Sequence, residues 1–197
     1  MRIIISILGS TGSIGKSTLK IISIKKNIFS LNTLAANKNY RLIINQIKKF
    51  NPKNFVINDY NTYKRVQKKL RFSKTKIHYN FNFLKKIKKK DDVTVSAIPG
   101  LAGLEPTINY IKRTKKILIA NKESIICGWE IIQRSAKKHK TEIIPIDSEH
   151  FSISKLIKDY DDSEIEKIYI TASGGPFLSR PISQFKSIKP SDAIKHP

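Results

Sequence analysis

The stretch GSTGSIG at residues 9–15 decides the fold of this chain. An apolar run over residues 2–8 precedes it, and an amphipathic stretch over residues 14–24 follows it. A strand, a glycine-rich turn and a helix in this order leave backbone N–H groups free at a helix N-terminus, where a phosphate can bind. The spacing is GxxGxxG rather than GxGxxG, and an ordinary strand-to-helix turn is the alternative. The position between strand and helix favours nucleotide binding.

The three glycines of this turn have distinct roles in a phosphate-binding loop. Gly9 allows the tight turn, Gly12 lets the backbone approach a pyrophosphate, and Gly15 lets the helix pack against the strand. The residues between them offer hydroxyl donors to an anion: Ser10, Thr11 and Ser13.

Apolar and amphipathic segments alternate along the chain as far as residue 146. Further strands are predicted over residues 29–35, 55–57, 93–98, 116–120 and 142–146. Helices are predicted over residues 40–50, 63–70, 81–87, 104–111 and 131–139, with another opening at residue 121. This alternation predicts an α/β fold with a doubly wound, mostly parallel, Rossmann-like sheet.

The pattern changes from residue 151 onward. An acidic, polar linker covers residues 159–164, and a strand is predicted over residues 165–171. A glycine-rich turn follows, and two prolines then enclose a short helical piece over residues 181–190. This change indicates that a second domain begins near the end of the predicted sheet.

The net charge is +23, from 38 lysines and arginines against 15 aspartates and glutamates. One interpretation is a nucleic-acid or anionic-membrane partner. The other is a compositional bias toward Lys, Ile and Asn. The basic residues are spread over nearly every predicted helix and loop, and no aromatic ladder for stacking bases accompanies them. We therefore expect no specific nucleic-acid partner, although the charge favours phosphorylated ligands.

Cysteine content and hydropathy bear on the location of the protein. Cys127 is the single cysteine, which excludes an internal disulfide and agrees with a reducing cytoplasm. No apolar run approaches the ~20 residues that span a membrane, so we expect no membrane partner. Met1 leads directly into the first strand, and we expect no signal peptide.

A basic loop follows the second predicted strand, roughly twenty residues past the glycine turn. NAD-specific folds place an acidic residue there, on the ribose hydroxyl. This chain has Asn37, Lys38 and Asn39 instead. A cation suits a 2′-phosphate, so the loop favours NADPH over NADH. The alternative is a solvated strand-to-helix loop.

Two carboxylates, Asp147 and Glu149, leave the end of the predicted strand 142–146 on either side of Ser148. At this spacing they can converge on one divalent cation, and hard oxygen ligands suit Mg²⁺ or Mn²⁺. A solvated turn is the alternative, but acids are rare in this chain. His150 beside them is more typical of a packed or supporting side chain than of a metal ligand.

Two further polar segments are candidates for anion binding. Lys122 stands between Asn121 and Glu123 after the predicted strand 116–120. A lysine at the carboxyl edge of a sheet can bind a phosphate, a hydroxyl or a developing oxyanion, although an ordinary surface lysine is the alternative. The stretch SGG at residues 173–175 can form a nest of consecutive N–H groups, with a simple turn as the alternative.

The sequences of these motifs and their order along the chain resemble those of 1-deoxy-D-xylulose 5-phosphate reductoisomerase. The motifs are GSTGSIG at residues 9–15, ANKES at 120–124, PIDSEH at 145–150, SGGPF at 173–177 and the HP pair at 196–197. The family converts 1-deoxy-D-xylulose 5-phosphate to 2-C-methyl-D-erythritol 4-phosphate, in the non-mevalonate route to isoprenoids. It uses NADPH together with Mn²⁺, Mg²⁺ or Co²⁺. The resemblance covers the chain from end to end.

The resemblance implies roles for particular residues. Those implied to bind NADPH are Thr11, Gly12, Ser13, Ile14, Asn37, Lys38, Asn39, Asn121 and Glu123. Those implied to bind the metal are Asp147 and Glu149. Those implied to contact the phosphorylated sugar are Lys122, Ser148, Glu149, Ser173 and His196, with Lys122 and Glu149 as the catalytic residues. Asn37 departs from the glycine that many members carry.

The resemblance also implies an NADPH-binding domain over residues 1–146 and the beginning of an α+β catalytic domain over residues 147–197. Members of the family are homodimers. They continue past the HP pair with a loop that closes over the substrate, further phosphate ligands and a glutamate as third metal ligand. We therefore expect residues 1–197 to be an N-terminal portion that is inactive alone. The alternatives are a nucleotide-binding remnant without turnover and a basic nucleic-acid-binding module.

Overall fold

The computed structural model describes residues 2–87, 89–171 and 174–194. Its contacts divide the chain into two compact units, residues 1–154 and 155–197. The division falls within the helix that begins at Ser148. The functional boundary expected after Ile146 stays a prediction.

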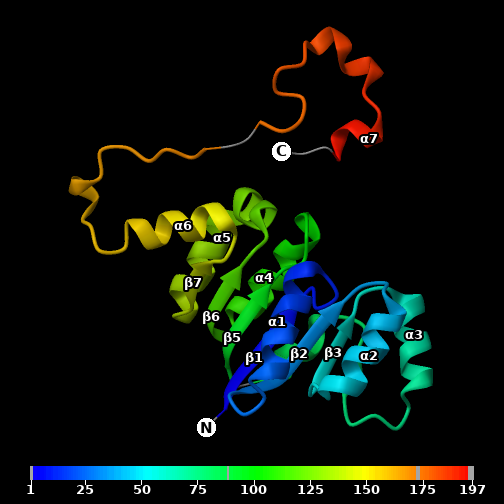
Figure 1. Ribbon diagram of the computed structural model, residues 1–197. Coiled ribbons are helices and arrows are strands. Elements are labelled where there is room, and N and C mark those ends of the chain that lie inside the picture. The colour runs from blue at the N-terminus through cyan, green and yellow to red at the C-terminus, as the bar shows by residue number, and fades with distance from the viewer. Residues whose placement is uncertain (1, 88, 172–173, 195–197) are drawn as a thin grey trace. The chain divides into compact units, whose positions relative to one another are not determined.

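The first unit is built on a parallel sheet with the strand order β4-β3-β2-β1-β5-β6-β7, as Figure 1 shows. Every pairing of neighbouring strands among the described residues is parallel. The strands are β1 (Ile3–Leu8), β2 (Phe29–Ala36), β3 (Asn54–Ile57), β4 (Lys76–His78), β5 (Asp91–Ser96), β6 (Thr114–Ile119) and β7 (Glu142–Pro145). The α/β prediction is therefore confirmed.

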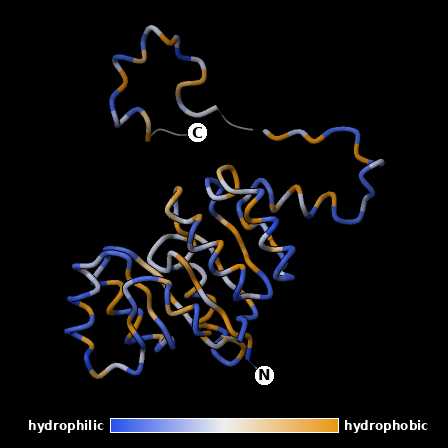
Figure 2. The backbone as a smooth tube through the Cα atoms, turned by 180° about the vertical axis from the view of Figure 1, so that it is seen from behind, coloured by the Kyte–Doolittle hydropathy of each residue, from blue (hydrophilic) through white to orange (hydrophobic). Residues whose placement is uncertain are grey.

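Helices cover both faces of this sheet. The covering helices are α1 (Ser13–Ile24), α2 (Tyr40–Phe50), α3 (Tyr60–Lys69), α4 (Leu104–Ile111) and α5 (Lys122–His139), with 3₁₀ turns η1 (Phe81–Lys86) and η2 (Leu101–Gly103). The helix α6 (Ser148–Leu156) follows β7 and buries none of its residues. One buried core joins α1, α2 and α3 to the sheet, and a second joins α4 and α5 to it. Figure 2 shows hydrophobic stretches of the tube running through the strands between these two layers.

The order of the strands creates a crevice at the carboxyl edge of the sheet. β1 lies between β2 and β5, so the chain moves outward from β1 in both directions. Leu8, the last residue of β1, pairs with Ala35 on one side and Ser96 on the other. In open parallel sheets ligands bind in the crevice at such a switch point, outside the carboxyl ends of the strands. The glycine turn opens directly into it.

Asparagine and aspartate caps determine where three helices begin. Asn39 accepts the backbone N–H of Leu42 at 3.2 Å, and Asp59 accepts that of Thr62 at 2.8 Å. Asn121 accepts the backbone N–H of Ser124 at 2.9 Å. Each carboxamide or carboxylate satisfies an N–H that has no partner within its helix.

Two helices differ from the sequence prediction because of local backbone chemistry. The helix α3 begins three residues before the predicted start at residue 63, because Asp59 caps it. The helical segments expected from residue 121 and over 131–139 are joined as α5, with Gly128 in a non-helical conformation at the junction. Gly128 is buried against Leu104, where an added Cβ would lie 2.4 Å from a methyl carbon.

The second unit contains η3 (Asp162–Glu164), η4 (Ile182–Ser187) and α7 (Pro190–Ala193). The strand predicted over residues 165–171 is wrong, because the structure has no strand there. The apolar side chains of this segment are largely exposed, with Tyr169 at 82% and Ile170 at 65%. β-branched residues favour a strand only when a neighbouring strand and a core bury them. None of the helices described is long and apolar enough to span a bilayer.

A polar network, partly buried, runs across the sheet from β5 to β4. The Asp91 carboxylate accepts a hydrogen bond from Ser6 Oγ at 2.5 Å and another from Asn32 Nδ2 at 2.7 Å. The network continues from Asn32 to Asn54 at 3.3 Å and from Asn54 to His78 at 3.0 Å. Burial raises the pKa of Asp91 to about 6, although its two hydrogen bonds oppose the rise. The charged form of Asp91 therefore opposes folding.

We expect Asp91→Asn to raise the free energy of unfolding relative to the unaltered chain, and to do so more at pH 7 than at pH 4. The cost of ionised Asp91 is absent below its ordinary pKa of 3.8 and complete above its folded pKa of about 6. A shift of this size corresponds to roughly 3 kcal/mol. Urea unfolding of both proteins between pH 4 and 8 measures the difference.

Asp92→Asn is the matched control for this prediction. Hydrogen bonds from Lys115 and the backbone of Ile4 lower the pKa of Asp92, so its charge favours folding at neutral pH. That contribution is lost as the pH falls through the folded pKa, and the variant should show the opposite trend. Parallel pH profiles for Asp91→Asn and the unaltered chain would contradict our account of Asp91.

Candidate functional site

The glycine turn is held tightly between β2 and β5. The backbone N–H groups of Gly9 and Ser10 both donate to Ala35 O, at 2.9 and 2.8 Å. Gly9 has a φ of +86°, and a Cβ there would lie 2.4 Å from Ala97 O. A Cβ on Gly15 would lie 2.3 Å from Gly9 O. The roles predicted for these two glycines, a tight turn and close helix packing, agree with this geometry.

The N-terminus of α1 is open to solvent beyond this turn. Gly12 occupies the N-cap position, and no side chain caps the helix. Gly12, Ser13 and Ile14 are exposed, and Thr11 is half-buried. The first turn of the helix carries no acidic residue. An uncapped helix N-terminus with a positive dipole end is suited to an anion.

The prediction that the Ser10 hydroxyl is a donor to an anion is wrong. Its side chain is fully buried and donates to Gln46 Oε1 at 2.7 Å, while Gln46 Nε2 donates back to Ser10 O at 2.8 Å. This hydroxyl therefore fastens the turn to α2 and is not available to a ligand. The signal was a glutamine on the isoleucine face of α2, where a polar side chain needs a buried partner.

The basic loop lies at the carboxyl end of β2, beside the glycine turn. Asn37, Lys38 and Asn39 directly follow β2 and are all exposed. Asn39 uses its side-chain oxygen to cap α2. Hydrogen bonds from Thr62 are the main cause of the lowered pKa of Asp59, and the charge of Lys38 lowers it further. The structure thus brings Lys38 to the same sheet edge as the open end of α1.

The side chain of Asn121 is buried and bonded within the protein, whereas a simple ligand contact would be exposed. Only 4% of the residue is exposed, and its amide nitrogen donates to Ile98 O and to Gly100 O, the latter at 2.9 Å. Its oxygen caps α5 at Ser124. The side chain therefore joins the loop after β5 to the start of α5. Glu123, in the first turn of α5, is exposed.

Lys122 and Glu149 meet across the adjacent ends of β6 and β7. Ile119 pairs with Pro145 in these two strands, so the residues that follow them lie side by side. Lys122 Nζ is 3.1 Å from Glu149 Oε1, and both side chains are about half exposed. The backbone N–H of Glu149 lowers the pKa of its own carboxyl group, and Lys122 lowers it further. The structure confirms that the two segments share one edge.

Asp147 is the cap of α6 and the partner of His150. Its Oδ1 accepts the His150 backbone N–H at 3.1 Å and lies 2.6 Å from His150 Nδ1. Burial acts to raise the pKa of Asp147, but these hydrogen bonds outweigh it and leave the pKa below its ordinary value. His150 thus contacts the candidate ligand Asp147 through both its backbone and its ring.

The donor set at this edge consists of hard oxygen atoms. No group of three acidic, histidine or cysteine side chains lies close enough to hold a metal ion within residues 2–87, 89–171 and 174–194. Ser148 stands exposed between the two carboxylates. The predicted substrate contacts Ser173 and His196 lie outside the described residues.

The fold and this edge define a nucleotide-binding type of α/β protein with a carboxylate pair. Residues 5–128 match the family model described as 1-deoxy-D-xylulose 5-phosphate reductoisomerase. Residues 143–197 match the model of that enzyme's C-terminal domain. The chain belongs to the 1-deoxy-D-xylulose 5-phosphate reductoisomerase family.

Curated relatives carry the same name. The protein of Pelagibacter ubique is 50% identical over 196 residues, covering 98% of this chain and 50% of its own length. That of Clostridium novyi is 41% identical over 197 residues, covering 98% of this chain and 51% of its own length. The chain therefore spans about half the length of these relatives.

Solved structures of the family have the same fold. A reductoisomerase in complex with NADPH, fosmidomycin and magnesium superposes with a TM-score of 0.86 at 32% identity, covering 99% of this chain and 51% of that one. The Zymomonas mobilis enzyme in complex with NADPH gives 0.85 at 30% identity, covering 100% and 52%.

We expect Lys122→Met to raise the pKa of Glu149, because the variant removes a positive charge and a hydrogen bond from its carboxylate. Titration of the Glu149 carboxyl carbon by NMR measures the shift. The pKa of Asp147 should stay unchanged, since His150 rather than Lys122 lowers it. Lys20→Met, which changes an exposed lysine of α1, is the control. An unchanged pKa of Glu149 in Lys122→Met would show that the ion pair does not exist in solution.

Proposed function

We propose that this chain supplies the NADPH-binding part and two metal-binding carboxylates of a 1-deoxy-D-xylulose 5-phosphate reductoisomerase. The main support for this proposal is that several groups lie along one edge of the sheet. They are the uncapped N-terminus of α1, Lys38, Lys122, Asp147 and Glu149. The reaction is the conversion of 1-deoxy-D-xylulose 5-phosphate to 2-C-methyl-D-erythritol 4-phosphate.

The residues at the crevice fit NADPH. Free N–H groups at the start of α1 suit the pyrophosphate, and exposed Lys38 suits the 2′-phosphate. The proposed contacts are Thr11, Gly12, Ser13, Ile14, Asn37, Lys38, Asn39, Asn121 and Glu123. Asn121 contributes by fixing the loop after β5 and the start of α5, because its side-chain amide is already engaged.

The carboxylates fit a hard divalent cation. Both acids have lowered pKa values and are ionised at neutral pH, and oxygen donors suit Mg²⁺, Mn²⁺ or Co²⁺. The metal, when bound, supplies Lewis-acid polarisation of the substrate carbonyl, and NADPH supplies hydride. Asp147 and Glu149 would hold the cation, and Glu149 is also a proposed substrate contact. Because Lys122 pairs with Glu149, it would lie near a substrate that contacts Glu149.

Lys122 has a charge-stabilising role in this proposal. Its ammonium group is half exposed and 3.1 Å from Glu149, so it can turn from that carboxylate to a substrate oxygen. A cation there stabilises negative charge that develops during rearrangement. Ser148, Ser173 and His196 are the further substrate contacts that we propose.

We also propose that residues 1–197 bind the cofactor but do not turn over substrate by themselves. In support, no group of three acidic, histidine or cysteine side chains is placed to hold a metal ion within the part of the chain that the structure describes. The relatives are about twice as long as the region they share with this chain. The complete enzyme is proposed to be a cytoplasmic homodimer.

Lys38→Ala should weaken NADPH binding at least tenfold and leave NADH binding unchanged. The variant removes a charge-assisted contact of roughly 1.5–3 kcal/mol to the 2′-phosphate, which NADH lacks. Quenching of intrinsic fluorescence or calorimetry measures both affinities. Lys48→Ala, which removes an equal charge from the last turn of α2, is the control. Equal NADPH affinity in Lys38→Ala and the unaltered chain would overturn this role.

Purified residues 1–197 should bind NADPH without oxidising it when 1-deoxy-D-xylulose 5-phosphate and Mn²⁺ are added. Loss of absorbance at 340 nm, followed with the Pelagibacter ubique enzyme as a positive control, measures turnover. Steady oxidation by the chain alone would refute the proposed inactivity. Tight, salt-dependent DNA binding without NADPH affinity would instead favour the nucleic-acid module.

A further inference from the structure

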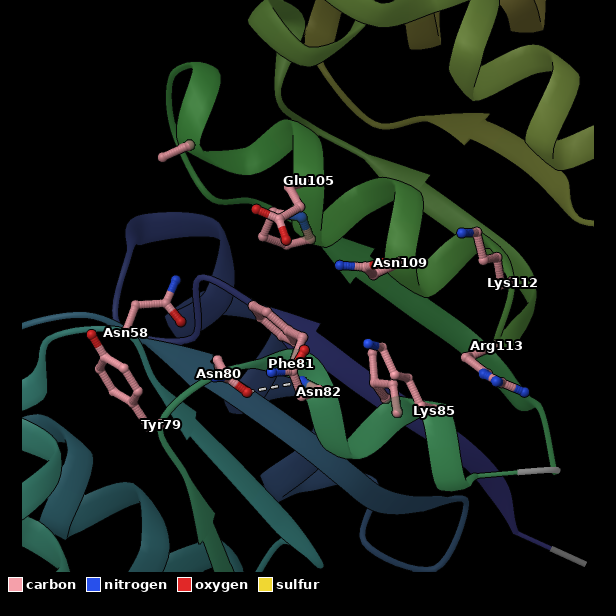
Figure 3. A pocket seen from close by; sticks show the side chains of 13 residues that line it. Asn58, Tyr79, Asn80, Phe81, Asn82, Lys85, Glu105, Asn109, Lys112 and Arg113 are labelled. Atoms are coloured by element: carbon pink, nitrogen blue, oxygen red, sulfur yellow. Dashed lines mark hydrogen bonds between the residues drawn. The ribbon is translucent and has the colours of Figure 1, made fainter.

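A groove of about 700 Å³ lies in the first unit between η1 and α4. This volume is within the range of small-molecule binding sites. Its walls come from η1, α4 and the segments that follow β3, β4 and β5, as Figure 3 shows. None of the residues proposed to bind NADPH, metal or substrate lines it.

Three cations gather at one end of the groove. Lys85 comes from η1, and Lys112 and Arg113 follow the last turn of α4, so the two walls face each other with like charge (Figure 3). Within the described part of the chain, none of these three side chains forms an ion pair. Opposed cations repel one another unless an anion lies between them.

Two neighbouring acids already have cationic partners. Asp92 pairs with Lys115 at 2.7 Å, and Glu142 pairs with Lys116 at 2.9 Å, both at the amino end of the sheet. The local field is positive enough to affect a nearby histidine. Burial lowers the pKa of His139, and the surrounding charges lower it further: Lys138, Lys90, Lys112 and Arg113. An external anion would therefore meet uncompensated positive charge at this end.

The other end of the groove is polar and aromatic. Tyr79 and Phe81 line it, and Phe81 is fixed edge-on against buried Tyr110, with ring centroids 6.0 Å apart. Asparagine side chains surround these rings and offer both donors and acceptors: Asn58, Asn80, Asn82 and Asn109. Glu105 is the one acid among the described lining residues. Such a surface suits a planar ring with hydrogen-bonding edges.

We propose that this groove is a second binding site, for a small phosphorylated molecule that carries a polar ring. Lys85, Lys112 and Arg113 hold its phosphate, and the ring lies beside Tyr79 and Phe81 among the asparagines. The guanidinium of Arg113 can form paired hydrogen bonds to the phosphate oxygens, and the two lysines contribute point charges. The size of the groove favours a single nucleotide-sized ligand over a macromolecule.

Calorimetry with AMP, adenosine and inorganic phosphate tests the proposal on the full 197-residue chain. AMP should bind at least tenfold more tightly than adenosine or phosphate, because only AMP fills both ends. The double variant Lys112→Gln/Arg113→Gln should lower AMP affinity at least tenfold and leave NADPH affinity unchanged. Lys85→Gln, on the opposite wall, should also weaken AMP binding. This single variant tests the proposal if the double variant does not fold.

Two control variants distinguish binding in this groove from a general charge effect and from binding in the cofactor crevice. Lys48→Gln/Lys49→Gln removes a second adjacent pair of cations, from the end of α2, and should leave AMP affinity unchanged. Lys38→Ala, in the proposed cofactor site, should also leave it unchanged. Loss of AMP binding in Lys38→Ala, or an equal loss in both double variants, would overturn the proposal. Unaltered AMP affinity in the groove variants would overturn it too. So would a chain that binds a short RNA but has no affinity for AMP.

Discussion

The first unit depends on the close approach of two backbones at Gly9. The turn after β1 fills the space between β2 and β5: its N–H groups bond to Ala35 O, and no room remains for a Cβ beside Ala97 O. This contact brings the ends of three strands together and sets the direction in which α1 leaves the sheet. The crevice, the open helix N-terminus and the position of Lys38 all follow from that geometry.

The helix-covered parallel sheet was predictable from the alternation of segments rich in apolar residues with amphipathic segments, which is typical of strands and helices that share a core. The meeting of Lys122 with Glu149 was predictable for a topological reason, since both follow adjacent parallel strands. The engagement of Ser10 by Gln46 was not, because a hydroxyl in a glycine turn has the same sequence signature whether it faces a ligand or a helix. The absence of a strand at residues 165–171 depends on neighbours, which local propensity does not encode.

Charge is distributed unevenly between the two edges of the sheet. At the carboxyl edge both candidate metal ligands have a basic partner, with Glu149 on Lys122 and Asp147 on His150. At the amino edge Asp92 and Glu142 also pair with lysines, and the cations of the groove, Lys85, Lys112 and Arg113, have no acidic partner in the described chain. The net charge of +23 therefore has a local structure that composition alone does not reveal.

The buried side-chain amide of Asn121 couples the loop after β5 to the first turn of α5. It bonds to the loop after β5 at Ile98 and Gly100 and to the start of α5 at Ser124, and a side chain at position 103 would collide with it. A displacement of the loop beside the cofactor crevice must therefore either break these bonds or carry the first turn of α5 with it. Lys122 begins that turn, so the position of its ammonium group is coupled to the loop after β5.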